Sequence, residues 1–191
     1  MTIEITEGTF RFKTPKVLLW FGMVSIIMLF AGLTSAYIIR QAKGQWLEFE
    51  IPAPFYISTF IILISSATLF WAQVSAKKDN PPGLISGIGI SFLLGICFII
   101  SQVMGWEDMV ESGIFFTGPG SNVSASFLYV ITALHAAHVS GGIIALLITF
   151  INSLKKKYNS KKILGLQLCS TYWHFLGALW IYLFLFLLFV R

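Results

Sequence analysis

The 191-residue sequence has little charge and few of the residues that usually perform chemistry. Charged residues make up 11% of it, whereas a soluble domain has about a quarter, and 57% of the residues are apolar. Its two cysteines, Cys97 and Cys169, are expected at depths that differ by roughly 15 Å, which is too far for a disulfide, and both are expected to be buried. This composition excludes an ordinary soluble domain and predicts a membrane protein.

Acidic residues are missing from the long apolar segments. All eight lie outside them: Glu4, Glu7, Glu48, Glu50, Asp79, Glu107, Asp108 and Glu111. No lysine or arginine lies deep in an apolar segment either. Pumps and ion transporters generally need ionisable groups at depth, so a small autonomous transporter is disfavoured.

Five apolar runs are long enough to cross a membrane as helices, which takes about 20 residues. They cover residues 17–39, 54–76, 84–106, 125–154 and 166–190. The runs lack the alternation of barrel strands, and the first is too long for a cleaved signal peptide. We therefore expect an all-α fold, a bundle of five transmembrane helices forming one membrane domain over residues 1–191.

Basic residues are unevenly shared between the two sides that such a bundle creates. One side, with the N-terminus and the second and fourth loops, carries ten basic residues, and the other carries Arg40, Lys43 and Arg191. The positive-inside rule then predicts a cytoplasmic N-terminus and a periplasmic C-terminus. The cluster KKKYNSKK (155–162) is explained as a topology signal, and Lys155, Lys156 and Lys157 are also candidates for contact with anionic lipid headgroups. The net charge of +5 therefore does not indicate nucleic-acid binding.

Small or weakly polar residues recur at helical spacing along every run. Such seams let helices approach closely in lipid and form hydrogen bonds between them, so they predict a compact bundle or part of one. The seams are Gly22, Ser25, Gly32 and Ala36; Ser58, Ser65, Thr68 and Ala72; Gly87, Ser91, Gly95 and Gln102; His135, His138, Gly142 and Ala145; and Ser170, His174 and Gly177.

The three histidines are the only titratable groups deep in the runs. His138 and His174 are expected near the same depth on neighbouring helices, where they could meet. Two opposed histidines could bind haem, and three could bind a metal. Alternatively, they are neutral rings hydrogen-bonded between helices. The spacing alone leaves these alternatives open.

The histidine-bearing segments resemble subunit III of the haem-copper terminal oxidases (the cytochrome c oxidase family), in its short five-helix bacterial form. FLYVITALHAAHVSGG (127–142) resembles a family signature through Phe127, Thr132, His135, His138, Val139 and Gly142. YWHFLGALW resembles another through Tyr172, Trp173, His174 and Trp180. Gln102, Thr68 and the segment MLFAGLTSAYIIR (28–40) match further family positions.

The resemblance implies a non-catalytic subunit of a proton-pumping oxidase of aerobic respiration. Such a chain has no catalytic, cofactor-binding or metal-binding residue, and haem and copper lie in partner subunits. It packs on subunit I within a complex that includes subunit II, binds membrane phospholipids and supports proton uptake and stability during turnover. Its place is the bacterial inner membrane, and further small subunits or a respiratory supercomplex are additional partners to consider. The alternative is an independent membrane cytochrome with histidine-ligated haem.

Two departures from the family pattern remove carboxylates. Ile26 stands where the family has a glutamate in its first span, and Gly177 stands where the last signature has an aspartate. The nearest remaining acids, Glu48 and Glu107, are expected in loops. If this chain assists proton uptake, it does so without a carboxylate of its own inside the membrane. The histidines, on this resemblance, join the last two helices.

Overall fold

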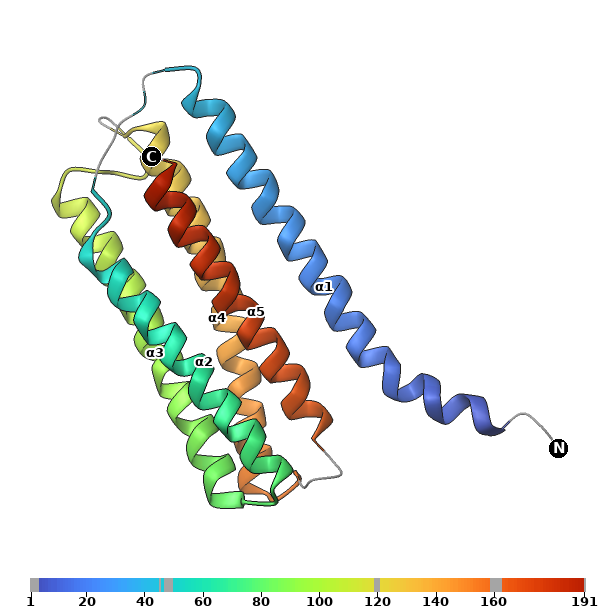
Figure 1. Cartoon of the computed structure of the whole chain (residues 1–191). Coiled ribbons are helices and arrows are strands. Elements are labelled where there is room, and N and C mark those ends of the chain that lie inside the picture. Colours follow the sequence, from blue (N-terminus) through green and yellow to red (C-terminus); the bar gives the residue numbers. More distant parts are fainter. Residues whose placement is uncertain (1–3, 45, 47–49, 119–120, 159–162, 191) are drawn as a thin grey trace.

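The computed structural model contains five long helices in an up-and-down bundle (Figure 1). It describes residues 4–44, 46, 50–118, 121–158 and 163–190. The helices are α1 (Glu4–Gln41), α2 (Ala53–Lys77), α3 (Pro81–Glu111), α4 (Val123–Leu154) and α5 (Leu164–Phe189). All five are long and apolar enough to cross a membrane, the first over Thr14–Gln41. The prediction of five membrane-spanning helices is confirmed.

The helix ends follow local sequence signals. Pro52 and Pro54 begin α2, and Pro81 and Pro82 occupy the first turn of α3, where a missing backbone N–H costs nothing. The side chains of Asn80 and Asn122 accept hydrogen bonds from Gly83 N and Ser124 N and so cap α3 and α4.

Helix α3 extends five residues beyond the predicted end at Trp106. Glu107, Asp108 and Glu111 are therefore exposed positions of its last turns, and the expectation that Glu107 lies in a loop was wrong. A helix can continue beyond its apolar segment when the residues of its last turns are polar and exposed. Glu48, Lys161, Lys162 and Arg191 lie outside the described residues.

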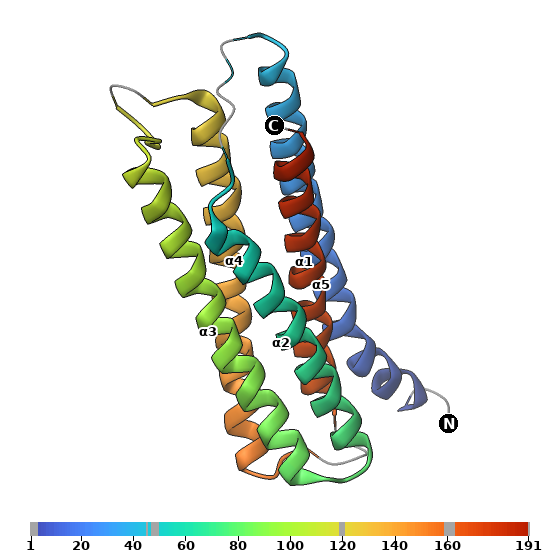
Figure 2. The same ribbon diagram turned by 60° about the vertical axis from the view of Figure 1, so that its left-hand side comes forward.

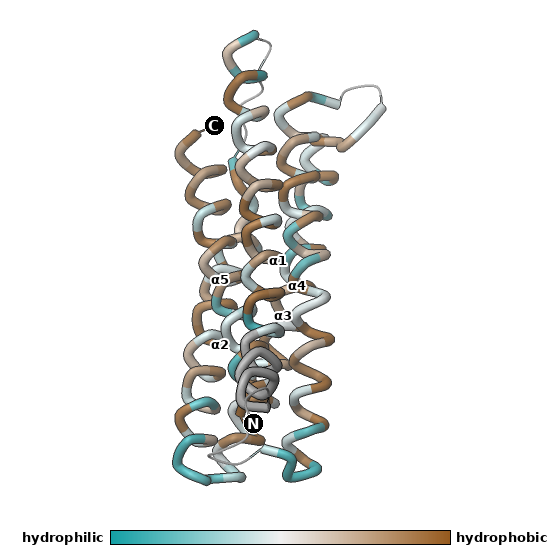
Figure 3. Tube along the Cα trace, turned by 90° about the vertical axis from the view of Figure 1, so that its right-hand side faces the viewer, coloured by the Kyte–Doolittle hydropathy of each residue, from teal (hydrophilic) through white to brown (hydrophobic). Residues whose placement is uncertain are grey.

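The connections alternate between the two ends of the bundle. Figure 1 shows the start of α1 and the α2–α3 and α4–α5 connections at one end, and the C-terminus at the other. We call the first the basic end, since it carries Lys16, Lys77, Lys78 and Lys155–Lys157. Hydrophilic residues gather at the ends and apolar residues between them (Figure 3).

Helices α2 to α5 form the packed core, and α1 lies to one side. Helix α2 packs closely along α3 (Figure 2), and both α3 and α2 adjoin the α4–α5 pair. Among the described residues, helix α1 contacts α4 and α5 but not α2 or α3. Its buried side chains form one narrow stripe of Met23, Phe30, Thr34 and Tyr37.

The small-residue seams pack inside the bundle on four helices but not on α1. Gly87, Gly95 and Gly142 are buried, and a Cβ added to Gly87 or Gly95 would lie 2.7 Å from a neighbouring atom. On α1, Gly22, Ser25, Gly32 and Ala36 are exposed, and no atom lies within 4 Å of a Cβ added to either glycine. This seam therefore does not pack within the chain, because α1 uses larger side chains for its contacts.

Candidate functional site

The candidate site residues take part in a set of hydrogen bonds that join the helices in the middle of the bundle. Thr68 Oγ1 lies 2.8 Å from Ser91 Oγ, and Ser65 Oγ donates to the Ser91 carbonyl oxygen at 3.1 Å. Trp173 Nε1 donates to Ser65 Oγ at 3.1 Å. These bonds connect α2, α3 and α5 through buried groups, so Thr68 and Trp173 serve to hold the bundle together.

Gln102 joins α3 to α2 near the opposite end. Its Nε2 donates to Ser58 Oγ at 2.8 Å, and Ser101 Oγ donates to the Pro54 carbonyl oxygen at 2.7 Å. The Oε1 of Gln102 is buried without a hydrogen-bond partner among the described residues. Gln102 thus links α3 to α2 through its Nε2, and its Oε1 is an acceptor that this link leaves unused.

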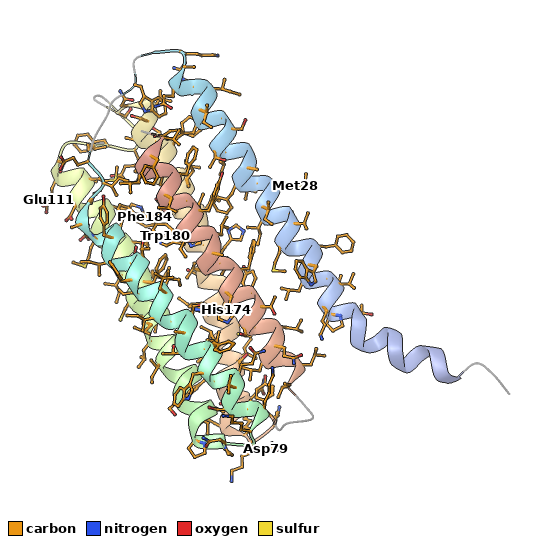
Figure 4. All side chains as sticks on the ribbon, viewed as in Figure 1. Met28, Asp79, Glu111, His174, Trp180 and Phe184 are labelled. Atoms are coloured by element: carbon orange, nitrogen blue, oxygen red, sulfur yellow. The ribbon has the colours of Figure 1, made fainter. Side chains whose placement is uncertain are left out.

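His138 and His174 do not pair with each other. His138 Nδ1 donates to the Leu134 carbonyl oxygen at 2.7 Å within α4, and the ring lies edge-on to Phe30 of α1. His174, within α5 (Figure 4), is hydrogen-bonded through Nδ1 to Ser66 of α2. One hydrogen bond between α5 and α4 involves the backbone of His138. Its carbonyl oxygen accepts from the Tyr172 hydroxyl at 3.3 Å.

The two histidines, which the sequence allowed to meet, thus bond to other groups instead. The two residues have similar depths on adjacent helices, but depth does not fix the direction in which a side chain leaves its helix. The register of α4 directs His138 towards α1 and leaves His135 to face α5. His174 faces α2.

His135 is the histidine that packs α4 against α5. It is fully buried, and its ring centroid lies 5.1 Å from that of Trp180. Phe30 and Phe98 approach at 6.3 Å and 5.9 Å with their planes steeply inclined. Neither ring nitrogen has a hydrogen-bond partner within the described part of the chain. Aromatic packing, rather than hydrogen bonding, positions this ring.

The arrangement of the histidines does not suit a metal or haem ligand set. Within the described residues, no three His, Cys, Asp or Glu side chains come close enough together to bind a metal ion. For haem, two imidazole nitrogens would have to oppose each other across space for the macrocycle. Here Phe30, Phe98 and Trp180 surround His135, His138 lies against Phe30 of α1, and His174 lies against Ser66 of α2, so the three rings face different partners.

Sequence reasoning missed a series of polar pairs between α2 and α5. Trp180 Nε1 donates to Thr59 Oγ1 at 3.0 Å, and His174 is hydrogen-bonded to Ser66. Thr59, Ser66 and Gln73 recur every seven residues and so lie on one face of α2. That seven-residue spacing could have predicted the pairs. The sequence analysis instead followed the small-residue seam of the same helix.

The lysines and cysteines complete the candidate residues. Lys155, Lys156 and Lys157 are exposed beyond the end of α4.

Cys169 is buried as predicted, but Cys97 is exposed on α3, so its predicted burial was wrong. A thiol on a lipid-facing surface behaves as a small apolar group, which explains why the sequence pattern did not distinguish the two faces.

Comparisons with known proteins agree on one family. The family described as "Cytochrome c oxidase subunit III" matches residues 17–190. A "Cytochrome c oxidase subunit 3" of Corynebacterium diphtheriae is 30% identical over 172 residues, covering 86% of this chain and 82% of the relative. One of Thermostichus vulcanus is 32% identical, covering 85% and 80%. A "Cytochrome bo(3) ubiquinol oxidase subunit 3" of Pseudomonas aeruginosa is 27% identical, covering 86% and 79%.

Proposed function

Because this chain belongs to the cytochrome c oxidase subunit III family, we propose that it is the non-catalytic third subunit of a proton-pumping haem-copper oxidase in aerobic respiration. The resemblance inferred from its histidine motifs is confirmed by these comparisons. As a multi-pass membrane protein and an oxidase subunit III, it belongs to a complex with other oxidase subunits. Subunits I and II, with haem and copper, are its proposed partners.

One observation carries the non-catalytic part of this proposal: the polar groups in the membrane interior are used for packing. Trp173, Gln102 and His174 bond to serines of α2, and Thr68 bonds to Ser91 of α3. His135 is enclosed by aromatic rings. A bundle held in this way offers a rigid surface to a partner subunit rather than a site for its own redox chemistry.

We further propose that residues 1–191 form a single membrane domain with a cytoplasmic N-terminus in the bacterial inner membrane. The basic end collects Lys16, Lys77, Lys78 and Lys155–Lys157, which supports a cytoplasmic position for it. Cysteine labelling with a membrane-impermeant reagent tests this orientation. A cysteine replacing Lys156 should react only after the membrane is opened, whereas one replacing Glu111 should react in intact cells from which the outer membrane has been removed.

The proposed role in proton uptake is indirect: shielding the uptake region and holding lipid. Ile26 is half-buried on α1, and Gly177 is buried on α5 facing Ile62, so neither position supplies an acid. A hydrophobic carbodiimide, which modifies protonated carboxyls in apolar surroundings, should therefore leave α1–α5 unlabelled between their ends. Peptide mapping of the treated complex checks this, and a modified residue within Thr14–Gln41 would contradict it. Ile26→Glu should create a labelled site.

Purification through a tag on this chain tests the main proposal. We expect haem-copper subunits to co-purify, with all haem absorbance assigned to them after the subunits are separated. Recovery of this chain alone with a Soret band would instead establish an independent cytochrome. His138→Leu should leave the haem spectrum of the assembled complex unchanged.

A further inference from the structure

A hollow lies on the outward surface of the α3–α4 pair, near the end of the bundle opposite the basic end. We call this opposite end the acidic end, since it carries Glu50, Glu107, Asp108 and Glu111. Helices α3 and α4 run side by side here (Figure 2). The hollow has a volume of about 470 Å³, and its lining is Trp106 of α3, Phe116 of the α3–α4 connection, and Tyr129, Val130, Ala133 and Leu134 of α4.

The polar atoms of the two amphipathic rings in this lining are already bonded within the chain. Trp106 Nε1 donates to Thr132 Oγ1 at 3.0 Å, and the Tyr129 hydroxyl donates to the Ile114 carbonyl oxygen at 3.0 Å. The hollow therefore presents apolar surface to whatever enters it. An apolar side chain suits it, whereas a polar ligand would lose its hydrogen bonds to water there.

A second hollow adjoins the first at Trp106 and brings negative charge to it. It has a volume of about 350 Å³ and is lined by Val103, Trp106, Glu107, Val110 and Glu111. The two carboxylates are exposed and lie four residues apart, so they are neighbours on one face of α3. Glu111 marks the end of this helix in Figure 4. We call the two hollows together the α3–α4 groove: it is apolar along its length and acidic at one end.

Small side chains continue the α3–α4 groove along α4 towards the middle of the bundle. Ala133, Ala137 and Gly141 recur every four residues and are exposed, and a Cβ added to Gly141 would meet no atom within 4 Å. The outward face of α2 instead carries large exposed side chains, such as Phe60 and Trp71. Acyl chains adapt to either kind of face, but small residues are what allow the backbone of another helix to approach closely.

We propose that the α3–α4 groove and the small face of α4 are a docking surface for one transmembrane helix of a partner oxidase subunit. A large apolar side chain of that helix fills the hollow beside Trp106, and its backbone lies against Ala137 and Gly141. A lysine or arginine at its end lies beside Glu107 and Glu111, where a long basic side chain can reach the interface from an apolar helix. The proposal rests on the proposed function and adds the face and the chemistry by which a partner is recognised.

Site-specific photocrosslinking in membranes that contain the tagged full-length chain tests this surface. The crosslinker p-benzoylphenylalanine replaces Ala137 on the small face or Val110 at the rim of the groove. Its matched control replaces Phe60, an aromatic residue on the outward face of α2 that is 68% exposed. Both groove positions should crosslink to one membrane-spanning peptide of a haem-copper subunit, with Lys or Arg in the turn nearest Glu107. The control should not yield this peptide.

Two sets of variants separate charge from shape. Glu107→Gln with Glu111→Gln should lower the yield from Val110 about two- to fivefold, because an exposed ion pair contributes little. The control pair, Glu50→Gln with Asp108→Asn, removes two charges from the same end but outside the groove, and it should keep the yield. Gly141→Leu, at an open position, should lower the yield about tenfold, which corresponds to about 1.4 kcal/mol.

Each outcome decides the proposal. Crosslinks to phospholipid alone would show that lipid covers the surface and would overturn it, as would equal yields of the peptide from the groove and from position 60. A crosslinked helix without a basic residue at that end, or equal yields in the two charge variants, would overturn the choice of a basic partner. Co-purification of haem-copper subunits is scored before irradiation, so failure of the oxidase assignment is distinguished from failure of the docking surface.

Discussion

Helix α1 and the α2–α5 bundle are built from similar residues but are held in different ways. In the most apolar window of α1, 17% of residues are buried, against 44% for α5. The four packed helices exchange hydrogen bonds between side chains and place glycines against neighbouring helices. Helix α1 contributes ring edges and one hydroxyl pair, and Met28 lies on its outer side (Figure 4). Substitutions inside the α2–α5 bundle are therefore expected to be more destabilising than substitutions in α1. The outer face of α1 is still available to lipid or a partner.

Trp173→Ala, in the interior of the bundle, should give the largest effect. Trp173 is 1% exposed, donates a hydrogen bond to Ser65 and contacts the glycine positions of α3 and α4. Its loss should lower the free energy of unfolding by about 3–5 kcal/mol, measured by unfolding in mixed micelles. Trp71→Ala, on the exposed face of α2, is the control and should change it by less than about 0.5 kcal/mol. Equal effects would contradict the assignment of these two faces.

Gly87→Ala compares close packing with the open seam of α1. A Cβ at Gly87 would lie 2.7 Å from Ala72 Cβ and 3.0 Å from backbone atoms of Ala72 and Thr68. Because backbone cannot move aside locally, we expect a loss of about 1–3 kcal/mol in the free energy of unfolding. Gly32→Ala should be neutral or should stabilise by up to about 1 kcal/mol through helix propensity. A destabilising Gly32→Ala in the isolated chain would show that this seam packs within it.

Ser58→Ala tests how far the bundle depends on satisfied polar groups. It removes the acceptor of Gln102 Nε2 and leaves a buried donor unpaired, which should cost about 1 kcal/mol of unfolding free energy. Adding Gln102→Leu removes the unpaired donor, so the double variant should recover most of that loss. A double-mutant cycle on unfolding free energies checks this, and strictly additive losses would argue against the bond.

Thr34→Val should give the smallest effect, because it removes a single side-chain hydrogen bond between α1 and α5. Thr34 Oγ1 lies 3.2 Å from the hydroxyl of Tyr182, which is 48% exposed. Side-chain hydrogen bonds between membrane helices average about 0.6 kcal/mol, and we expect no larger change. Tyr182→Phe should match it, and the two together should cost no more than either alone. A loss above about 2 kcal/mol would mean that α1 is an integral part of the bundle.

The amino-acid sequence by itself determined the number and type of elements and the family. Length and hydropathy are sufficient for this because backbone polar groups in hydrocarbon must be satisfied within each helix. Several predicted seam positions are buried, among them Ser65, Gly87 and Gly142, and Trp173 and Gln102 donate hydrogen bonds to serines of α2. These depend on small or polar groups that gain only when another helix covers them.

Only the tertiary structure decided which faces meet. The seam of Gly22 and Gly32 was expected to pack, yet α1 turns its Phe30 and Tyr37 stripe towards the bundle. The sequence allowed His138 and His174 to meet, yet each has another partner, and Ser66, which the sequence did not single out, bonds to His174. In water, a hydrophobic stripe identifies the buried face of a helix. In a membrane, lipid is as apolar as a protein core, so both faces carry similar residues and the orientation of each helix is set by the packing of its neighbours.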